Sequence, residues 1–173
     1  MLRLSKLGDY GTVVMAHMAR APERTYSASE LAAAVSLGRP TVTKLLKLLA
    51  HEKLVVSQRG AKGGYTLART PAEISIAQIV DAVEGRIGVT ECSVEAGLCA
   101  QEATCMSRGS WLRINRVIRD ALSAVTLDAF AGRGAASDAG VPMRARAVPV
   151  EVLADETSRS ATFREAAQCQ LKP

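Results

Sequence analysis

The stretch SASELAAAVSLGRPTVTKLLKLLAHEKLV, residues 27–55, most limits the folds open to this chain. Ser29 is placed to cap a short alanine-rich helix over 30–35, and SLGR then forms a tight turn at Gly38. Pro40 stands where a second helix begins, because its missing N–H costs nothing in a first turn. The apolar residues of that helix recur every three or four positions and face inward: Val42, Leu45, Leu46 and Leu49. The pattern predicts a helix-turn-helix.

The outward face of the second helix is polar and basic. It carries Thr41, Thr43, Lys44, Lys47 and His51. Residues 1–70 contain eleven Lys and Arg and four Asp and Glu. Residues 71–106 contain one Arg and six Asp and Glu. A basic region of this size indicates a polyanionic partner, and double-stranded DNA is the partner that a helix-turn-helix favours. A plain helical hairpin with solvated lysines is the alternative interpretation.

The stretch LVVSQRGAKGGYTLAR, residues 54–69, predicts a β-hairpin because two short strand-like runs flank RGAKGG. Arg59 and Lys62 occupy its tip, and the glycines let the loop come close to a phosphate backbone. RGAKGG lacks the spacing of a nucleotide-binding phosphate loop. A hairpin directly after a helix-turn-helix is typical of a winged helix.

Two further helices are expected beside this unit, one from Ser5 to Ala21 and one over 70–85 that Ser75 caps and Gly85 ends. A longer helix is expected over 110–130. Its apolar stripe is Trp111, Ile114, Ile118, Leu122, Val125 and Ala129, and its opposite face holds Arg113, Arg116 and Arg119. This stripe is larger than a small domain can cover, which favours burial against a second copy of the chain over an intramolecular core position.

The expected fold is therefore mainly α with a small β-wing. It divides into a winged helix-turn-helix domain (1–85), a cysteine loop (86–109), a dimerisation helix (110–130) and a disordered tail (131–173) in which Cys169 stands alone. The opening residues resemble no secretory leader, and no run of about eighteen apolar residues occurs. We expect a cytoplasmic protein with no membrane partner.

Three of the four cysteines lie close together, at Cys92, Cys99 and Cys105, with the spacing C-x6-C-x5-C and no helical or strand period around them. Unrelated buried thiols, a redox switch, zinc and an iron–sulfur cluster are the alternatives for cytosolic cysteines of this kind. Zinc sites usually contain closely spaced cysteine pairs, which are missing here. Thiolates are the usual ligands of iron–sulfur clusters, whose width suits gaps of this size, so the spacing favours a cluster.

The sequence offers nothing for enzyme chemistry. It contains no H-E-x-x-H motif and no nucleophile elbow, and its two histidines, His17 and His51, have no evident catalytic partner. We expect a protein that is not an enzyme.

Five stretches together carry a resemblance to a known family: LSKLGDYG, PTVTKLLKLLAHEKLV, RGAKGGYTLAR, the cysteine loop and WLRINRVIRDAL. Over residues 1–130 the chain resembles the iron–sulfur-sensing winged-helix regulators of the IscR, NsrR and RirA type, and most of all the regulators of the SUF cluster-assembly operon. The resemblance implies a homodimer on operator DNA with one cluster per chain. The implied ligands are Cys92, Cys99 and Cys105, and the implied DNA contacts are Thr41, Thr43, Lys44, Lys47, Arg59 and Lys62.

At the position of the fourth cluster ligand, this chain differs from one branch of the family. IscR-like members place a histidine three residues after the third cysteine, where this chain has Arg108, which cannot ligate. NsrR-like members use an aspartate in the first helix of the partner chain, and GDYG places Asp9 there. The resemblance thus implies Asp9 in trans, with 4Fe–4S favoured over 2Fe–2S. Alternatively, Asp9 only stabilises the start of its helix.

The residues predict a DNA-binding regulator with an iron–sulfur cluster, and the resemblance implies that it is a repressor of cluster-assembly genes. A metal-free regulator that responds to thiol oxidation or nitric oxide is the alternative.

Overall fold

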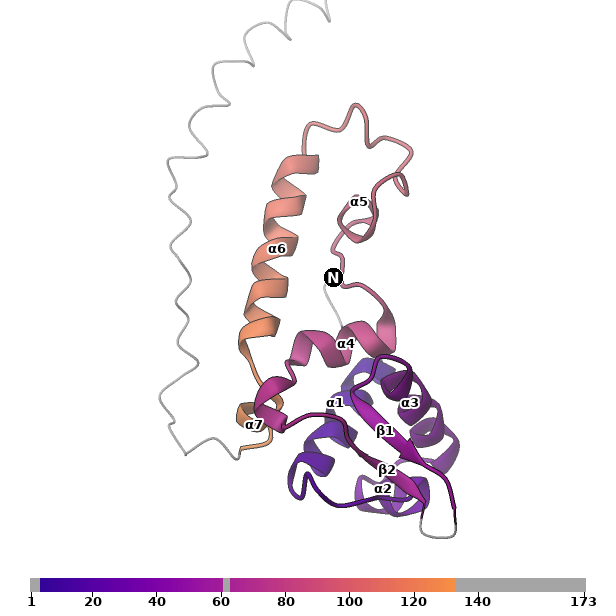
Figure 1. Ribbon diagram of the computed structural model, residues 1–173. Helices are drawn as coiled ribbons and strands as arrows, with labels where there is room; N and C mark the ends of the chain where they lie inside the picture. The colour runs from indigo at the N-terminus through magenta and orange to yellow at the C-terminus, as the bar shows by residue number, and fades with distance from the viewer. Residues whose placement is uncertain (1–3, 61–62, 133–173) are drawn as a thin grey trace, which may run out of the picture. The chain divides into compact units, whose positions relative to one another are not determined.

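The computed structural model describes residues 4–60 and 63–132 of the 173-residue chain (Figure 1). Its elements in chain order are α1 (Lys6–Ala19), α2 (Ala28–Ala34), α3 (Arg39–His51), β1 (Val55–Gln58), β2 (Gly64–Leu67), the 3-10 helix η1 (Pro71–Glu73), α4 (Ile76–Glu84), α5 (Glu91–Val94), α6 (Arg108–Ala124) and α7 (Leu127–Phe130). The expected fold, mainly helical with a two-stranded wing, is confirmed. All described residues belong to one unit, which runs over Met1–Ser137. Lys62, Cys169 and nearly all of the expected tail lie outside the described residues.

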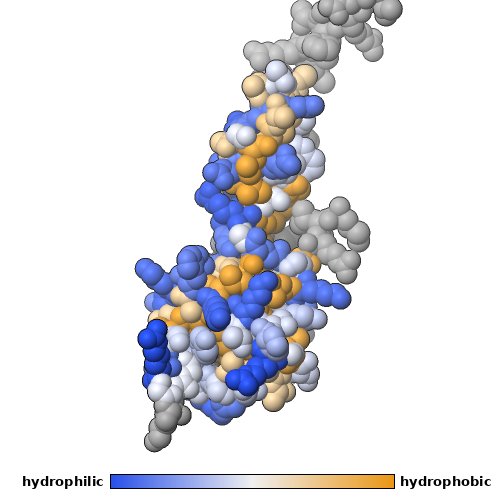
Figure 2. Space-filling view, turned by 90° about the vertical axis from the view of Figure 1, so that its right-hand side faces the viewer, coloured by the Kyte–Doolittle hydropathy of each residue, from blue (hydrophilic) through white to orange (hydrophobic). Residues whose placement is uncertain are grey.

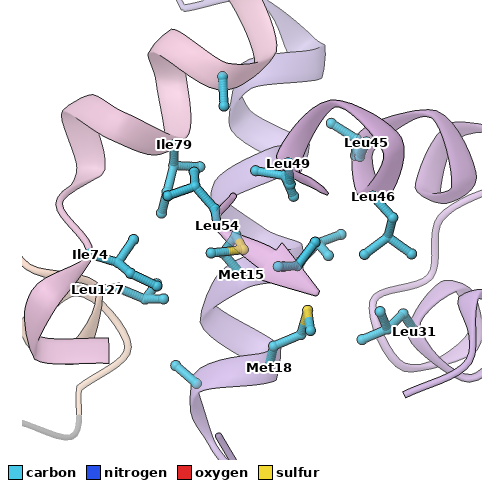
Figure 3. Close-up of a cluster of buried hydrophobic side chains, with 14 of the residues drawn as sticks. Met15, Met18, Leu31, Leu45, Leu46, Leu49, Leu54, Ile74, Ile79 and Leu127 are labelled. Atoms are coloured by element: carbon cyan, nitrogen blue, oxygen red, sulfur yellow. The ribbon is translucent and has the colours of Figure 1, made fainter. Parts of the chain in front are cut away.

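The core of the winged helix lies between α1, α3 and α4 (Figure 3). Its fully buried residues include Met15, Met18, Leu45, Leu46, Leu49 and Ile79. The buried residues of α3 are the stripe that the sequence predicts, Val42, Leu45, Leu46 and Leu49. Burying each large side chain contributes about 1.5–3 kcal/mol. This packing holds α3 with its opposite face outward.

The start of α2 differs from the expectation, because Ser27 and not Ser29 is the cap. The Ser27 hydroxyl accepts the N–H of Glu30 at 3.1 Å, and the Glu30 carboxylate accepts the N–H of Ser27 at 2.8 Å. This reciprocal capping box satisfies two backbone donors, which a cap at Ser29 does not. The predicted cap of α4 at Ser75 is confirmed, as is its end at Gly85, whose φ is 86°.

The turn between α2 and α3 also differs in detail, because Ser36 and not Gly38 takes the left-handed conformation, with a φ of 54°. The N–H of Leu37 donates to the carbonyl of Ala32 at 3.0 Å, and the N–H of Ser36 to Ala33 at 3.4 Å. These are the two bonds of a Schellman ending, which puts its left-handed residue directly after the helix cap. Gly38 is left to start α3 with an ordinary φ of −62°.

The wing is an antiparallel hairpin in which Val55 pairs with Leu67 and Gln58 with Gly64. Val55 is buried, and Arg59 is exposed directly after β1. Tyr26 adds a short bridge to Tyr65 through hydrogen bonds of 2.8 and 2.9 Å, which ties the wing to the chain before α2.

The expected helix over 110–130 is two helices, α6 and α7, with an extended link at Val125. The carbonyl of Val125 accepts the N–H of Ile76 at 2.9 Å, and the N–H of Leu127 donates to Ile74 at 2.7 Å. Leu127 is fully buried in the core of the winged helix. These bonds and this burial replace continued helical bonding, so Val125 and Ala129 leave the expected stripe.

Across 4–60 and 63–132, no helix combines the length and apolarity needed to span a bilayer.

Candidate nucleic-acid interface and cysteine segment

The outward side of α3 carries a hollow lined by Arg39, Pro40, Thr43, Lys44 and Lys47. Three of the expected DNA-contacting residues, Thr43, Lys44 and Lys47, therefore share one surface. Arg39 and Pro40 were not expected there. Pro40 precedes Thr43, Lys44 and Lys47 by three, four and seven residues, a helical spacing that indicates a shared face.

Thr41 is separated from this group. It is half-buried and does not line the hollow. Thr43 is also half-buried, and its hydroxyl donates to the Arg39 carbonyl at 2.9 Å.

The first turn of α3 adds to the positive potential of this face. Gly38 is its N-cap and provides no side-chain hydrogen bond to the free N–H groups of that turn. A helix start of this kind attracts anions, and Arg39, Lys44 and Lys47 are exposed beside it. Charge and shape together suit a phosphate backbone.

The three cysteines of the segment are half-buried free thiols. Cys92 lies in α5, a short helix that the sequence pattern did not predict, with its sulfur 3.3 Å from the Thr90 hydroxyl. The Cys105 sulfur lies 3.7 Å from the Ser107 hydroxyl. Hydrogen bonds from Ser107, with a smaller effect of the nearby Arg108 charge, lower the pKa of the Cys105 thiol and favour the thiolate.

Arg108 joins the loop between Cys99 and Cys105 to the start of α6. Its guanidinium donates to Glu102 at 2.5 Å, and the same carboxylate accepts the N–H of Gly97 at 2.5 Å. The Gly97 bond, followed by Arg108, lowers the pKa of Glu102. Arg108 therefore serves as an ion-pair partner at the position where the resemblance to IscR-like members leads to the expectation of a histidine.

The donor chemistry of the three thiols fits a thiolate-bound cluster, but the single chain does not assemble the site. Within the described residues, no three Cys, His, Asp or Glu side chains are gathered closely enough to hold a metal ion. Asp9 is exposed in the first turn of α1, which begins against the end of α4, where the Ser5 N–H donates to Glu84 at 2.9 Å. Gathering the thiols, and Asp9 with them, requires a rearrangement or a second chain.

Asn115 connects α6 to the segment before the cysteines. It is only 5 % exposed. Its Oδ1 accepts the N–H of Val89 at 3.3 Å, and its Nδ2 donates to the carbonyls of Ile87 at 3.3 Å and Ser93 at 3.4 Å. Asn115 is not among the residues that the sequence pattern singles out, although an asparagine beside an apolar stripe is a signal of a buried polar contact.

Arg119 was expected on the outer face of the long helix but is paired with Asp81 of α4. The two bonds of this bidentate pair measure 2.8 and 3.2 Å, and Asp81 also accepts the N–H of Ile87 at 3.1 Å. Bidentate geometry fixes orientation as well as energy. The start of the cysteine segment is thus hydrogen-bonded to α4 on one side and α6 on the other.

The first half of α6 leaves apolar side chains exposed, with Trp111 at 37 %, Ile114 at 45 % and Val117 at 54 %. In Figure 2, apolar surface lies among charged side chains on the part of the molecule that holds α5, α6 and the loop between them. Leu122, nearer the end of the helix, packs against the core instead. Of the expected stripe, Trp111 and Ile114 are therefore exposed among the residues that the structure describes, with Val117 beside them.

The comparisons with known proteins agree with this architecture. The family model Rrf2, described as an iron-dependent transcriptional regulator, matches residues 4–133. The chain belongs to the Rrf2 family. Rrf2 proteins are transcriptional regulators and not enzymes, which confirms the expected class and the expected absence of enzyme chemistry. The expected resemblance to IscR-type regulators is confirmed at the level of this family.

One Rrf2-type relative is an HTH-type transcriptional regulator of Neisseria meningitidis serogroup A, 33 % identical over 130 residues, which are 75 % of this chain and 87 % of the relative. Among solved structures, CymR, the global cysteine regulator of B. subtilis, is 29 % identical with a TM-score of 0.58 and covers 76 % of this chain and 98 % of its own. IscR of T. potens is 28 % identical with a TM-score of 0.58, and the match covers 75 % of this chain and 85 % of the IscR chain. The similar solved structures thus include both CymR and IscR.

Proposed function

We propose that this Rrf2 protein is a cytoplasmic, iron–sulfur-cluster-dependent repressor of cluster-assembly genes that binds operator DNA as a homodimer. The observation that carries the proposal is the position of the three free thiols, in one segment hydrogen-bonded to both α4 and α6. The repressing role and the target genes rest on the resemblance to SUF regulators.

Cys92, Cys99 and Cys105 would hold the cluster through their thiolates, with Asp9 of the partner subunit as the fourth ligand. When bound, the cluster supplies a group that is gained and lost with iron, oxygen or nitric oxide. The lowered pKa of the Cys105 thiol favours the ligating form. Three thiolates with one carboxylate favour 4Fe–4S, and 2Fe–2S is the other candidate.

The bonding pattern around the cysteines provides the connection to DNA. Bringing the three thiols together requires the segment to move, because they are not gathered in the single chain. Movement of the segment displaces the backbone that Asn115 and Asp81 hold, and Asp81 belongs to α4, which packs beside α3. A coupling of about 1–3 kcal/mol changes DNA affinity roughly 5–150-fold.

Lys44 and Lys47 on α3, with Arg59 and Lys62 in the wing, would neutralise phosphates, and Thr41 and Thr43 would approach bases. Two recognition helices related by a dimer axis predict a near-palindromic site. Phosphate contacts make the affinity strongly salt-dependent.

The test begins with anaerobic purification, a visible spectrum and iron and sulfide analysis. DNA binding by the cluster-loaded and cluster-free forms is then compared by fluorescence anisotropy, on duplexes selected from a random library and on DNA upstream of cluster-assembly genes. Cys92→Ala should abolish the brown colour, and Cys169→Ala, the matched control outside the segment, should keep it. Equal affinities of the cluster-loaded and cluster-free forms for every duplex would contradict the proposal that the cluster controls DNA binding.

A metal-free regulator that responds to thiol oxidation or nitric oxide is the second candidate. The free, ungathered thiols favour it. It predicts colourless anaerobic protein whose DNA affinity changes with oxidant or nitric oxide and is restored by reductant.

A further inference from the structure

The hydroxyl proton of Thr43 is already engaged in a hydrogen bond within α3. The hydroxyl donates to the carbonyl of Arg39, one helical turn earlier, at 2.9 Å. A threonine hydroxyl carries a single proton, so Thr43 keeps only its lone pairs and its γ-methyl group for a partner. It is therefore not a hydrogen-bond donor for a base edge.

The surroundings of Thr43 combine apolar surface with basic residues. Arg39, Pro40, Lys44 and Lys47 line the hollow with it, and most of the lining surface is apolar. Long basic side chains place their charged heads away from their stems, so the heads can reach phosphates while the stems remain in the hollow. The hollow suits a small apolar group beside a polyanion.

The major groove offers one such group, the C5-methyl of thymine. Guanine presents two acceptors there and needs a donor, which Thr43 lacks. We infer that Thr43 is a specificity-determining residue that contacts a thymine C5-methyl in the hollow on α3 and disfavours guanine at that position. The inference rests on the proposed DNA binding through α3 and adds the base and the atom that are read.

The experiment starts from duplexes that the full-length protein selects from a random library. Each thymine of the selected site is then replaced by deoxyuracil, which removes only the C5-methyl and keeps base pairing. One thymine per half-site should respond, and its replacement should weaken binding about fourfold, the effect of exposing one buried methyl group.

Three variants assign the effect to Thr43. Thr43→Ser keeps the hydroxyl and removes the γ-methyl, so the preference for thymine over deoxyuracil should disappear. Thr43→Val keeps a methyl group at that position and should preserve the preference. Thr25→Ser, the matched control outside α3 and outside the proposed DNA contacts, should leave the preference unchanged, and thermal melting checks that all three variants fold.

The outcomes separate this inference from the proposed function. If no thymine responds to deoxyuracil, or if Thr43→Ser retains the full effect, the inference is wrong while selection of a site still supports DNA binding. If the library yields no enriched sequence and no duplex binds, the proposed function fails and this inference fails with it.

Discussion

Two residues other than glycine adopt the left-handed backbone conformation that glycine usually takes. Ser36 and Lys53 follow the caps of α2 and α3, with φ values of 54° and 57°. After α3, the N–H of Leu54 donates to Leu49 at 2.9 Å and that of Lys53 to Ala50 at 3.1 Å. Both helices therefore end in Schellman motifs, which glycine fits without strain from a Cβ atom.

Replacing Lys53 by glycine should stabilise the fold. The left-handed conformation disfavours a Cβ atom, so Lys53→Gly should raise the free energy of unfolding by about 0.5–1 kcal/mol in urea titrations. Glu52→Gly is the control, because Glu52 has an ordinary φ of −84° and glycine there should destabilise. A fall in stability for Lys53→Gly contradicts the assigned ending.

Ser27 and Ser29 offer a matched pair at the start of α2. Ser27→Ala removes the capping hydroxyl and should lower the free energy of unfolding by about 1 kcal/mol. Ser29→Ala changes an exposed position inside the helix and should be neutral or slightly stabilising, since alanine is the better helix former. Chemical denaturation of both variants measures the difference, and equal losses would argue against Ser27 as the cap.

The difference in the free energy of unfolding between wild type and Ser27→Ala should depend on pH. The hydrogen bonds from Ser27 lower the pKa of Glu30 from its ordinary value of 4.5. A carboxylate with a depressed pKa stabilises the fold above that value, and the contribution is lost as pH falls through the depressed pKa. The difference between wild type and Ser27→Ala should therefore shrink on acidification below pH 4.5. Ser27→Ala keeps the backbone N–H that Glu30 accepts, so a difference that stays constant excludes a contribution from the bond between Glu30 and the Ser27 hydroxyl only.

At the scale of elements, α6 is fixed by polar contacts as well as by apolar ones. The buried Asn115 amide bonds to three backbone groups between Ile87 and Ser93, and Arg119 pairs with Asp81. An apolar residue at 115 would leave those backbone groups without partners. This connection is the one on which the proposed coupling between cysteines and DNA depends.

Asn115→Leu should destabilise the segment before Cys92 by about 1–3 kcal/mol, because unpaired buried backbone groups are costly. Hydrogen-exchange mass spectrometry should show faster exchange over residues 87–93. Arg116→Leu, at an exposed position on the same helix, is the control and should leave that exchange unchanged. Unaltered protection in Asn115→Leu would show that the amide does not hold the segment.

The break between α6 and α7 shows where sequence periodicity stops being informative. The apolar spacing continues through Val125 and Ala129, so the sequence alone predicts one helix. The break depends on the backbone groups of Ile74 and Ile76, about fifty residues earlier, which bond to Val125 and Leu127. A local pattern contains no information about such distant partners.

At the scale of the whole molecule, the exposed apolar residues of α6 and the ungathered thiols both suggest an incomplete assembly. Trp111, Ile114 and Val117 are exposed although the same helix packs Leu122 into the core. A second copy of the chain is the proposed partner for this surface, and it would also bring its own Asp9. The dimer and the cluster site are therefore expected to depend on each other.

Ile114→Glu should convert the proposed dimer into a monomer, because it places a charge within the apolar surface. Size-exclusion chromatography with light scattering gives the mass, and operator affinity should fall with it. Arg113→Glu, a neighbouring exposed position, controls for the change of charge. A dimeric Ile114→Glu protein would contradict the assignment of α6 to the interface.

The sequence by itself determined the winged helix, the outward position of Thr43, Lys44 and Lys47, the three-cysteine segment and the family. Apolar periodicity, turn residues and spacing are local properties, which the chain carries wherever it folds. The bond from Thr43 to Arg39 is local to α3 and depends on the side-chain rotamer, which the spacing does not specify. Only the tertiary structure decided that Arg108 and Arg119 are ion-paired and that α6 ends at Ala124. These features arise from contacts between residues far apart or in irregular segments, where sequence spacing does not specify the partner.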